Sequence, residues 1–158
     1  MSKRIPQATW SVETGPHVLV YCRSPRWWGQ IRQARWVESH AWVRVLPHPD
    51  ALLAEGLQLS QALSILELPS SDGESLLETV WRLATRRGLS RVACLAEPGQ
   101  AGYEFAYREA GAVEFLTSVA EFGRVRRALT QHLQNLPPLR LPWEQAIIQQ
   151  LPWRSLLP

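Results

Sequence analysis

From residue 17 onward the chain alternates between short apolar runs and longer amphipathic segments. The apolar runs are rich in branched residues and occupy 17–22, 41–46, 62–68, 91–96 and, more weakly, 113–116. Runs of this length between polar segments are typical of buried strands. Apolar residues recur at helical spacing over 25–39, 73–87, 103–110 and 122–133, and a short helix is predicted over 49–59.

This alternation of strands and helices predicts a three-layer α/β domain whose parallel sheet is buried on both faces. Five β–α units within about 120 residues fit a doubly wound, flavodoxin-like sheet with the strand order 2-1-3-4-5. A Rossmann dinucleotide fold is disfavoured, because the turn Cys22-Arg23-Ser24-Pro25 after the first strand contains no glycine.

The composition changes at both ends of this domain. We divide the chain into an N-terminal arm at 1–16, the α/β domain at 17–136 and a Pro/Trp-rich C-terminal tail at 137–158. The triplet Leu-Pro-Trp occurs twice in the tail and ends at Trp143 and Trp153. Because linkers avoid apolar anchors, we interpret the tail as a docking segment for this domain, a second copy or another protein.

Composition excludes several classes of protein. The chain has 158 residues, 46% of them hydrophobic, and a net charge of +3. This apolar content excludes wholesale disorder, and the small charge does not by itself indicate nucleic-acid binding. No apolar run approaches the roughly 18 residues of a membrane span, and the first 16 residues do not form a secretory signal. We therefore expect a cytoplasmic protein that does not bind membranes.

Three segments resemble the receiver domain of bacterial two-component response regulators. Residues 18–25 have the shape of the family's first strand and the loop after it. Residues 68–73, Leu-Pro-Ser-Ser-Asp-Gly, are similar to its Leu-Pro-x-x-Asp-Gly loop, and 109–117 are similar to its Glu-Ala-Gly-Ala passage into the fifth strand. The resemblance covers about 15–136 and implies the receiver fold and a role in signalling.

The resemblance does not extend to the family's phosphorylation site. Receivers use two acids and an acceptor aspartate to hold Mg²⁺, and a hydroxyl and a lysine to grip the phosphoryl group. The corresponding positions here are Cys22 and Arg23 for the acids, Ile65 or Glu67 for the acceptor, Ala96 for the hydroxyl and Ser118 for the lysine. The resemblance therefore implies a degenerate, phosphorylation-independent receiver that has no catalytic residue, metal or cofactor.

Other candidate chemistry has a simpler interpretation. In the predicted strand order Cys22 and Cys94 are separated by a third strand, which is too far for a disulfide. We expect reduced, structural thiols, with a reactive thiol at Cys22 as the alternative. His48 and Asp50 have the spacing of a general base and its partner, but a polar turn before a helix is the favoured interpretation. The chain is therefore predicted not to be an enzyme.

Arginine and tryptophan cluster at the start of the first helix, at Arg26, Trp27 and Trp28. Such a cluster suits a protein interface, a nucleic-acid stacking site or a helix that packs tryptophan on the sheet. We favour a scaffolding or signalling module whose partner is another protein or a second copy of the chain. The residues expected to contact this partner are Arg26, Trp27, Trp28, Trp143 and Trp153. The alternatives are a nucleic-acid-binding regulatory protein and a flavodoxin-like cofactor-binding protein.

Trp81 and Trp10 are expected to differ in their contribution to stability. Trp81 lies on the apolar stripe of the helix predicted over 73–87, so we expect it to face the sheet. Trp10 lies in the polar N-terminal arm. The stability of the domain is therefore expected to depend on Trp81 more than on Trp10.

Overall fold

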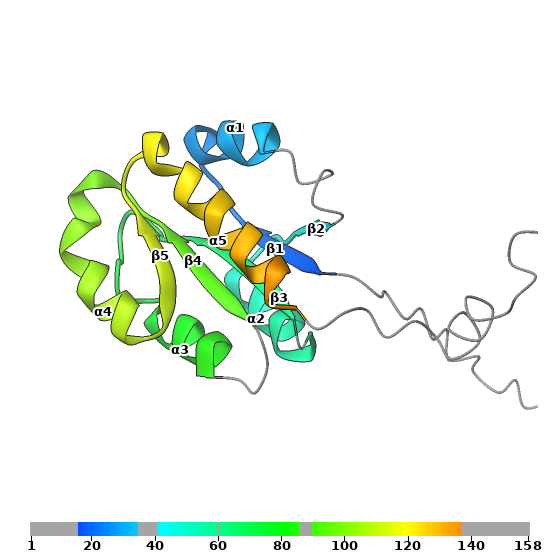
Figure 1. The fold of residues 1–158 in the computed structure, drawn as a ribbon. Helices are drawn as coiled ribbons and strands as arrows, with labels where there is room; N and C mark the ends of the chain where they lie inside the picture. The colour runs from blue at the N-terminus through cyan, green and yellow to red at the C-terminus, as the bar shows by residue number, and fades with distance from the viewer. Residues whose placement is uncertain (1–15, 35–40, 60, 86–89, 137–158) are drawn as a thin grey trace, which may run out of the picture. The chain divides into compact units, whose positions relative to one another are not determined.

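The computed structural model describes residues 16–34, 41–59, 61–85 and 90–136 (Figure 1). The arm before residue 16 and the tail from residue 137, with Trp10, Trp143 and Trp153, lie outside the described residues. The strands are β1 His17–Tyr21, β2 Trp42–Val45, β3 Ala62–Glu67, β4 Arg91–Leu95 and β5 Ala112–Leu116. The helices are α1 Pro25–Gln33, α2 Pro49–Gln58, α3 Leu77–Thr85, α4 Glu104–Glu109 and α5 Gly123–Gln134, with 3-10 turns η2 Pro98–Tyr103 and η3 Val119–Glu121.

The strands form one parallel sheet in the order β2-β1-β3-β4-β5, which confirms the predicted topology. Because a parallel strand sends alternate side chains to opposite faces, the sheet supports two separate cores. Leu19, Leu66 and Cys94 belong to the core beneath α2, α3 and α4. Val20 and Ile65 belong to the core beneath α1 and α5, the two helices that cover the near face in Figure 1.

Helix boundaries follow local backbone chemistry. Pro25 and Pro49 occupy the first turns of α1 and α2, where a missing N–H costs nothing. Gly111 follows α4 with a φ of 104°, a conformation that disfavours any side chain. These features place α2 and α4 close to their predicted positions.

Two helices are shorter than predicted at their described ends. Helix α1 was expected to reach residue 39, but Ala34 already has an extended conformation and caps it. Helix α3 was expected from residue 73. Instead, the Asp72 carboxylate accepts the N–H groups of Glu74 and Ser75, at 3.1 Å each, and holds a turn before Leu77.

The prediction that Trp81 faces the sheet is wrong. Trp81 is 55% exposed, whereas Leu76, Val80 and Leu83 form the buried stripe of this segment. Adjacent residues on a helix point about 100° apart, so the helix that buries Val80 turns Trp81 outward. Consequently Trp81 contributes little to the core.

Both cysteines are free, Cys94 in the core and Cys22 half-buried directly after β1. None of the helices within the described segments is long and apolar enough to cross a membrane.

His132 on α5 makes the stability of the domain dependent on pH. The side chain is buried, and burial, followed by the positive charge of Arg91, lowers its pKa. An unfolded histidine keeps a pKa of about 6.5, so below that pH the unfolded state binds more protons than the folded state. We therefore expect the free energy of unfolding to fall as the pH drops below about 6.5.

Urea unfolding at about pH 8 and about pH 5.5 measures this loss. The His132→Gln variant should lose this part of the pH dependence, while His48→Gln, at the exposed N-cap position of α2, should keep it. An identical pH profile for wild type and His132→Gln would show that His132 is not the group responsible.

Candidate functional site

The carboxyl ends of the parallel strands meet at one edge of the sheet, and most of the predicted site residues lie there. Cys22 and Arg23 directly follow β1, Glu67 ends β3, Ala96 follows β4 and Ser118 lies two residues after β5. Ile65, the alternative acceptor position, is buried inside β3 under α1 and α5. Of the two acceptor alternatives, Glu67 is therefore the one at this edge.

The Glu67 carboxylate joins the end of β3 to the loop between β1 and α1. Its Oε2 accepts the backbone N–H groups of Arg23 at 2.5 Å and Ser24 at 2.9 Å. Ser24 is the N-cap residue of α1, so the carboxylate lies at the positive end of this helix dipole. A negative charge supplied by the protein itself therefore occupies the N–H groups of this loop.

The protonation states of Glu67 and Cys22 are coupled. Burial raises the pKa of the Glu67 carboxyl, but the hydrogen bonds from Ser24, Arg23 and Cys22 outweigh burial and leave this pKa below its ordinary value. Burial, followed by the charge of Glu67 and the hydrogen bond to it, raises the pKa of the Cys22 thiol to about 12. At neutral pH the site thus holds a carboxylate beside a protonated thiol.

The resemblance to receivers implies a Mg²⁺ ion at this edge, and the residues present do not fit one. Mg²⁺ requires hard oxygen ligands, but Cys22 offers a protonated thiol and Arg23 a cation. The Glu67 oxygen that points into the loop is already engaged by two N–H donors. Across the described segments, no group of three or more His, Cys, Asp or Glu residues is arranged to hold a metal.

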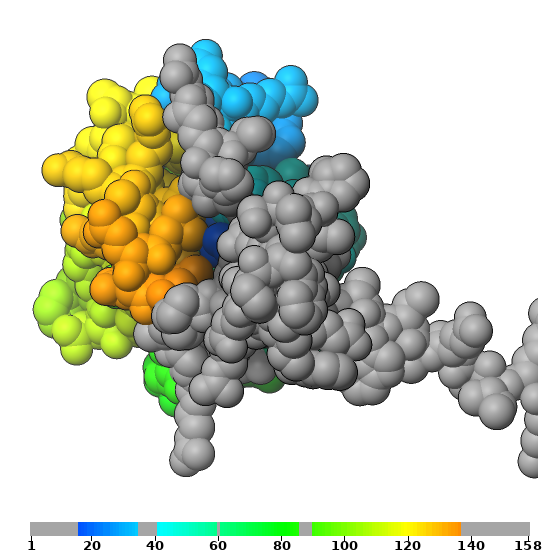
Figure 2. All heavy atoms as spheres, turned by 45° about the vertical axis from the view of Figure 1, so that its right-hand side comes forward, coloured from blue at the N-terminus to red at the C-terminus, as the bar shows by residue number. Residues whose placement is uncertain are grey.

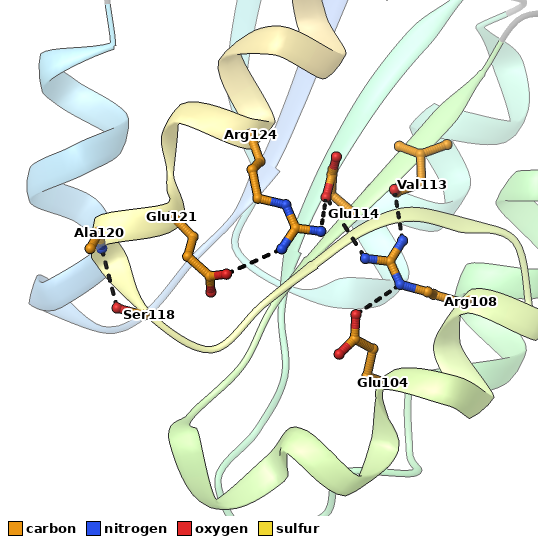
Figure 3. Close-up of polar contacts among 8 residues, drawn as sticks. All are labelled: Glu104, Arg108, Val113, Glu114, Ser118, Ala120, Glu121 and Arg124. Carbon is orange, nitrogen blue, oxygen red and sulfur yellow. Dashed lines mark hydrogen bonds and ion pairs between the residues drawn. The ribbon is translucent and has the colours of Figure 1, made fainter.

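The positions that grip a phosphoryl group in receivers have other roles here. Ala96 is buried, and its N–H donates to the carbonyl of Leu116 at 2.8 Å, which continues the sheet. Ser118 is exposed, and its Oγ accepts the N–H of Ala120 at 3.3 Å to start η3 (Figure 3). Ala96 has no side chain that could form a hydrogen bond, and the Ser118 hydroxyl is engaged within its own turn.

A second hydrogen-bonded group beside Glu67 escaped the sequence analysis. The Ser70 hydroxyl donates to Glu97 Oε1 at 2.8 Å, and Gln100 donates to the carbonyl of Pro69 at 2.7 Å. Gln100 also accepts the N–H of Glu97 at 2.9 Å, which completes a capping box at the start of η2. The Glu97–Gln100 spacing is the sequence signal of such a box.

These residues border an open pocket of about 400 Å³. Its wall includes Tyr21, Arg23, Glu67, Ser70, Ser71 and Glu97, from the loops after β1, β3 and β4. Leu68 and Pro69 also line the pocket, so its wall is part polar and part apolar and carries both a cation and carboxylates. Hydrogen bonds within the protein already engage both Glu67 and Glu97.

The predicted arginine–tryptophan surface is only partly present, and Trp27 is not part of it. Trp27 is 1% exposed and packs 6.5 Å from Phe122, ring centre to ring centre. The prediction that Trp27 contacts a partner is wrong, because the phase of α1 turns it onto the sheet. Arg26 lies over the Trp27 ring and donates to the carbonyl of Thr117 at 2.6 Å. Trp28 remains half-buried.

The sequence matches no protein-family model and no curated protein. Solved structures of response regulators nevertheless share its fold. The response regulator TrrA from Thermotoga maritima, in complex with Mg²⁺-BeF, aligns over 74% of this chain and 98% of its own, with a TM-score of 0.56 and 15% identity. The receiver domain of TorR, the response regulator of a TMAO respiratory system, aligns over 77% and 99%, with a TM-score of 0.59 and 17% identity.

A CheY-like receiver domain protein from Methanospirillum hungatei aligns over 77% of this chain and 98% of its own, with a TM-score of 0.58 and 12% identity. The likeness thus spans nearly the whole of each of these receivers at low sequence identity. The described domain therefore has the five-stranded receiver fold.

Proposed function

We propose that the chain is a receiver-like signalling module that acts through protein–protein contacts and needs no phosphorylation. The observation that carries this proposal is the pair of hydrogen bonds that the Glu67 carboxylate accepts from the N–H groups of Arg23 and Ser24. In receivers this edge of the sheet binds Mg²⁺ and the phosphoryl group. Here a resident carboxylate already links the loop after β1 to the end of β3.

The same geometry gives less support to a flavodoxin-like cofactor site. A phosphate needs free N–H groups in the first β–α loop, and Glu67 engages those of Arg23 and Ser24. Nucleic-acid binding also has less support, because Trp27 is buried and Arg32 already lies over the Trp28 ring, 5.4 Å from its centre. A steep loss of affinity with salt would favour the nucleic-acid alternative.

Treatment with a phosphoryl analogue tests the central claim. Full-length protein labelled with ¹⁵N is titrated with Mg²⁺ and beryllofluoride, and is separately incubated with acetyl phosphate for intact mass measurement. We expect no added phosphoryl mass and no Mg²⁺-dependent shifts of the Cys22, Arg23 and Glu67 amides. A receiver domain that retains both acids serves as the positive control.

A stable adduct on Glu67, or Mg²⁺-dependent shifts around Cys22, would show that the site still binds its family's ligands and would overturn phosphorylation independence. Contact-based signalling is tested by capture from native extract with full-length protein, with and without acetyl phosphate. The retained proteins should be the same in both samples. They should be lost with the variant Arg26→Glu, Trp28→Ser, which changes one exposed and one half-buried residue of α1, provided that this variant unfolds at the wild-type temperature.

A further inference from the structure

The two edge strands of the sheet are built differently. Strand β2 pairs with β1 alone among the described strands, in a regular register from His17↔Trp42 to Val20↔Val45. At the opposite edge, the β4–β5 register is irregular between Val92 and Ala93. Irregular edges resist pairing with further strands, whereas regular edges accept them.

Charge also protects the β5 edge. Glu114 on β5 lies between two arginines, 2.7 Å from Arg124 of α5 and 3.9 Å from Arg108 of α4 (Figure 3). Glu104 of α4 pairs with Arg108, and Glu121 of η3 pairs with Arg124, which extends this ionic network. Inserted charges of this kind discourage an incoming strand. Among the four residues of β2 only Arg44 is charged, and Arg44 is paired with Glu55 of α2 at 3.0 Å.

The outward backbone groups of β2 belong to Val43 and Val45. The N–H groups of Trp42 and Leu46 donate to the carbonyls of Pro16 and Val20, each at 2.8 Å, and so face β1. Because the N–H and C=O groups of successive strand residues alternate in direction, those of Val43 and Val45 face away from β1. These are the groups that an added strand would pair with.

The side chains of the same two valines are exposed on the face of the sheet covered by α1. Their register partners Val18 and Val20 belong to the core beneath α1 and α5. Val43 is nevertheless 38% exposed and Val45 53% exposed. An apolar, β-branched strip therefore runs along the unpaired edge, where water contacts it.

Helix α1 places a cation on the side of this strip. Gln30 and Gln33 line a groove with η3 and α5, so this flank of α1 faces α5, and Figure 2 shows the two helices beside each other. Trp28 and Arg32 lie on the opposite flank, with the guanidinium over the indole ring. Given the strand order, this flank faces the β2 edge. Helix α1 contains no acidic residue.

We propose that the β2 edge binds an extended segment of a partner protein as an additional strand, and that this segment carries both apolar and acidic residues on the face that α1 covers. Apolar side chains would cover Val43 and Val45, main-chain groups would pair with theirs, and the acids would be attracted by Arg32. The inference rests on the proposed function only in assigning the chain a protein partner.

Charge argues against a second copy of this chain as the occupant. Two β2 strands paired antiparallel about a two-fold axis perpendicular to the sheet would keep both α1 helices on the same face. Each α1 carries Arg32 on the flank that faces the β2 edge and contains no acidic residue, so two like-charged flanks would approach each other. An acidic segment of another protein would instead be attracted to this positive charge.

The test uses short acetylated peptides in which valine and glutamate take turns at every second position, so that both lie on one face of the strand, with threonine at the positions between them. A peptide of equal length with lysine in place of glutamate is the control. Each is titrated into ¹⁵N-labelled full-length protein. We expect the glutamate peptide to shift the Trp42–Val45 amides and to protect those of Val43 and Val45 from hydrogen exchange. The lysine peptide should not bind.

Matched variants separate main-chain pairing from charge. Val43→Pro removes an outward N–H and should weaken binding by about tenfold or more, whereas Val43→Thr keeps the N–H and the branched shape and should bind nearly normally. Arg32→Glu should also weaken binding by about tenfold, while Arg127→Glu on the exposed side of α5 should not. Chemical-shift dispersion and melting temperature verify that each variant is folded.

Three results would overturn the proposal. These are peptide-induced shifts that avoid β2, equal binding of the lysine peptide, and unchanged affinity in a folded Val43→Pro variant. A concentration-dependent dimer that protects the same two amides would replace the acidic partner with a second copy. None of these results depends on Mg²⁺ or beryllofluoride, so failure here is distinguishable from failure of phosphorylation independence.

Discussion

Replacing Trp27 with alanine is expected to lower the free energy of unfolding by about 3–5 kcal/mol, as truncation of a buried tryptophan does. Trp27 is the largest fully buried side chain among the described residues, and it packs with Ile31, Val20 and Phe122 between α1 and the sheet. Nothing nearby can fill so large a void without moving α1. A loss of this size is a large part of the roughly 5–15 kcal/mol that stabilises a single domain.

The matched control is Trp81→Ala, which removes the same side chain from a position that is 55% exposed. Its expected cost is below about 1 kcal/mol, because surface substitutions rarely exceed that. Urea unfolding followed by circular dichroism measures both variants and avoids the tryptophan signal that the substitutions alter. Equal losses, or a larger loss for Trp81→Ala, would show that the two helices pack in another phase.

The order of the elements was accessible from the sequence, because buried strands and amphipathic helices have different periods. All five strands and the order β2-β1-β3-β4-β5 follow from that alternation. The phase of α3 was not accessible. Val80 and Trp81 are adjacent and both apolar, and only the packed helix shows which of them faces the sheet. The burial of polar Thr79 on the same helix adds to the ambiguity.

The site was predicted in its positions but not in its contacts. Sequence left Ile65 and Glu67 as alternatives, because the length of the loop after β3 sets the alignment. The decisive partners of Glu67 are N–H groups of residues more than forty positions away, and a sequence does not record that proximity. The exposed β2 edge was equally hidden. Its residues Val43 and Val45 look like core residues until α1 is seen to end at Gln33.

The Cys22 thiol is expected to react with iodoacetamide about a thousand-fold more slowly than a free thiol at about pH 8. Its pKa is raised to about 12 by burial and by Glu67, so the reactive thiolate is scarce. The rate should rise about tenfold for each pH unit between about pH 7 and pH 9, because the thiolate fraction does so below the pKa. Intact mass measured over time on the folded Cys94→Ala variant reports Cys22 alone.

Adding Glu67→Gln to that variant should raise the rate, because it removes the negative charge that opposes thiolate formation while keeping the side-chain shape. Glu97→Gln, which changes a carboxylate of the same pocket that is bonded to Ser70 instead, should leave the rate nearly unchanged. Guanidinium-unfolded protein gives the free-thiol rate on the same chain. If folded Cys22 reacts at that rate, or ignores Glu67→Gln, the thiol and the carboxylate do not share the contact on which the site depends.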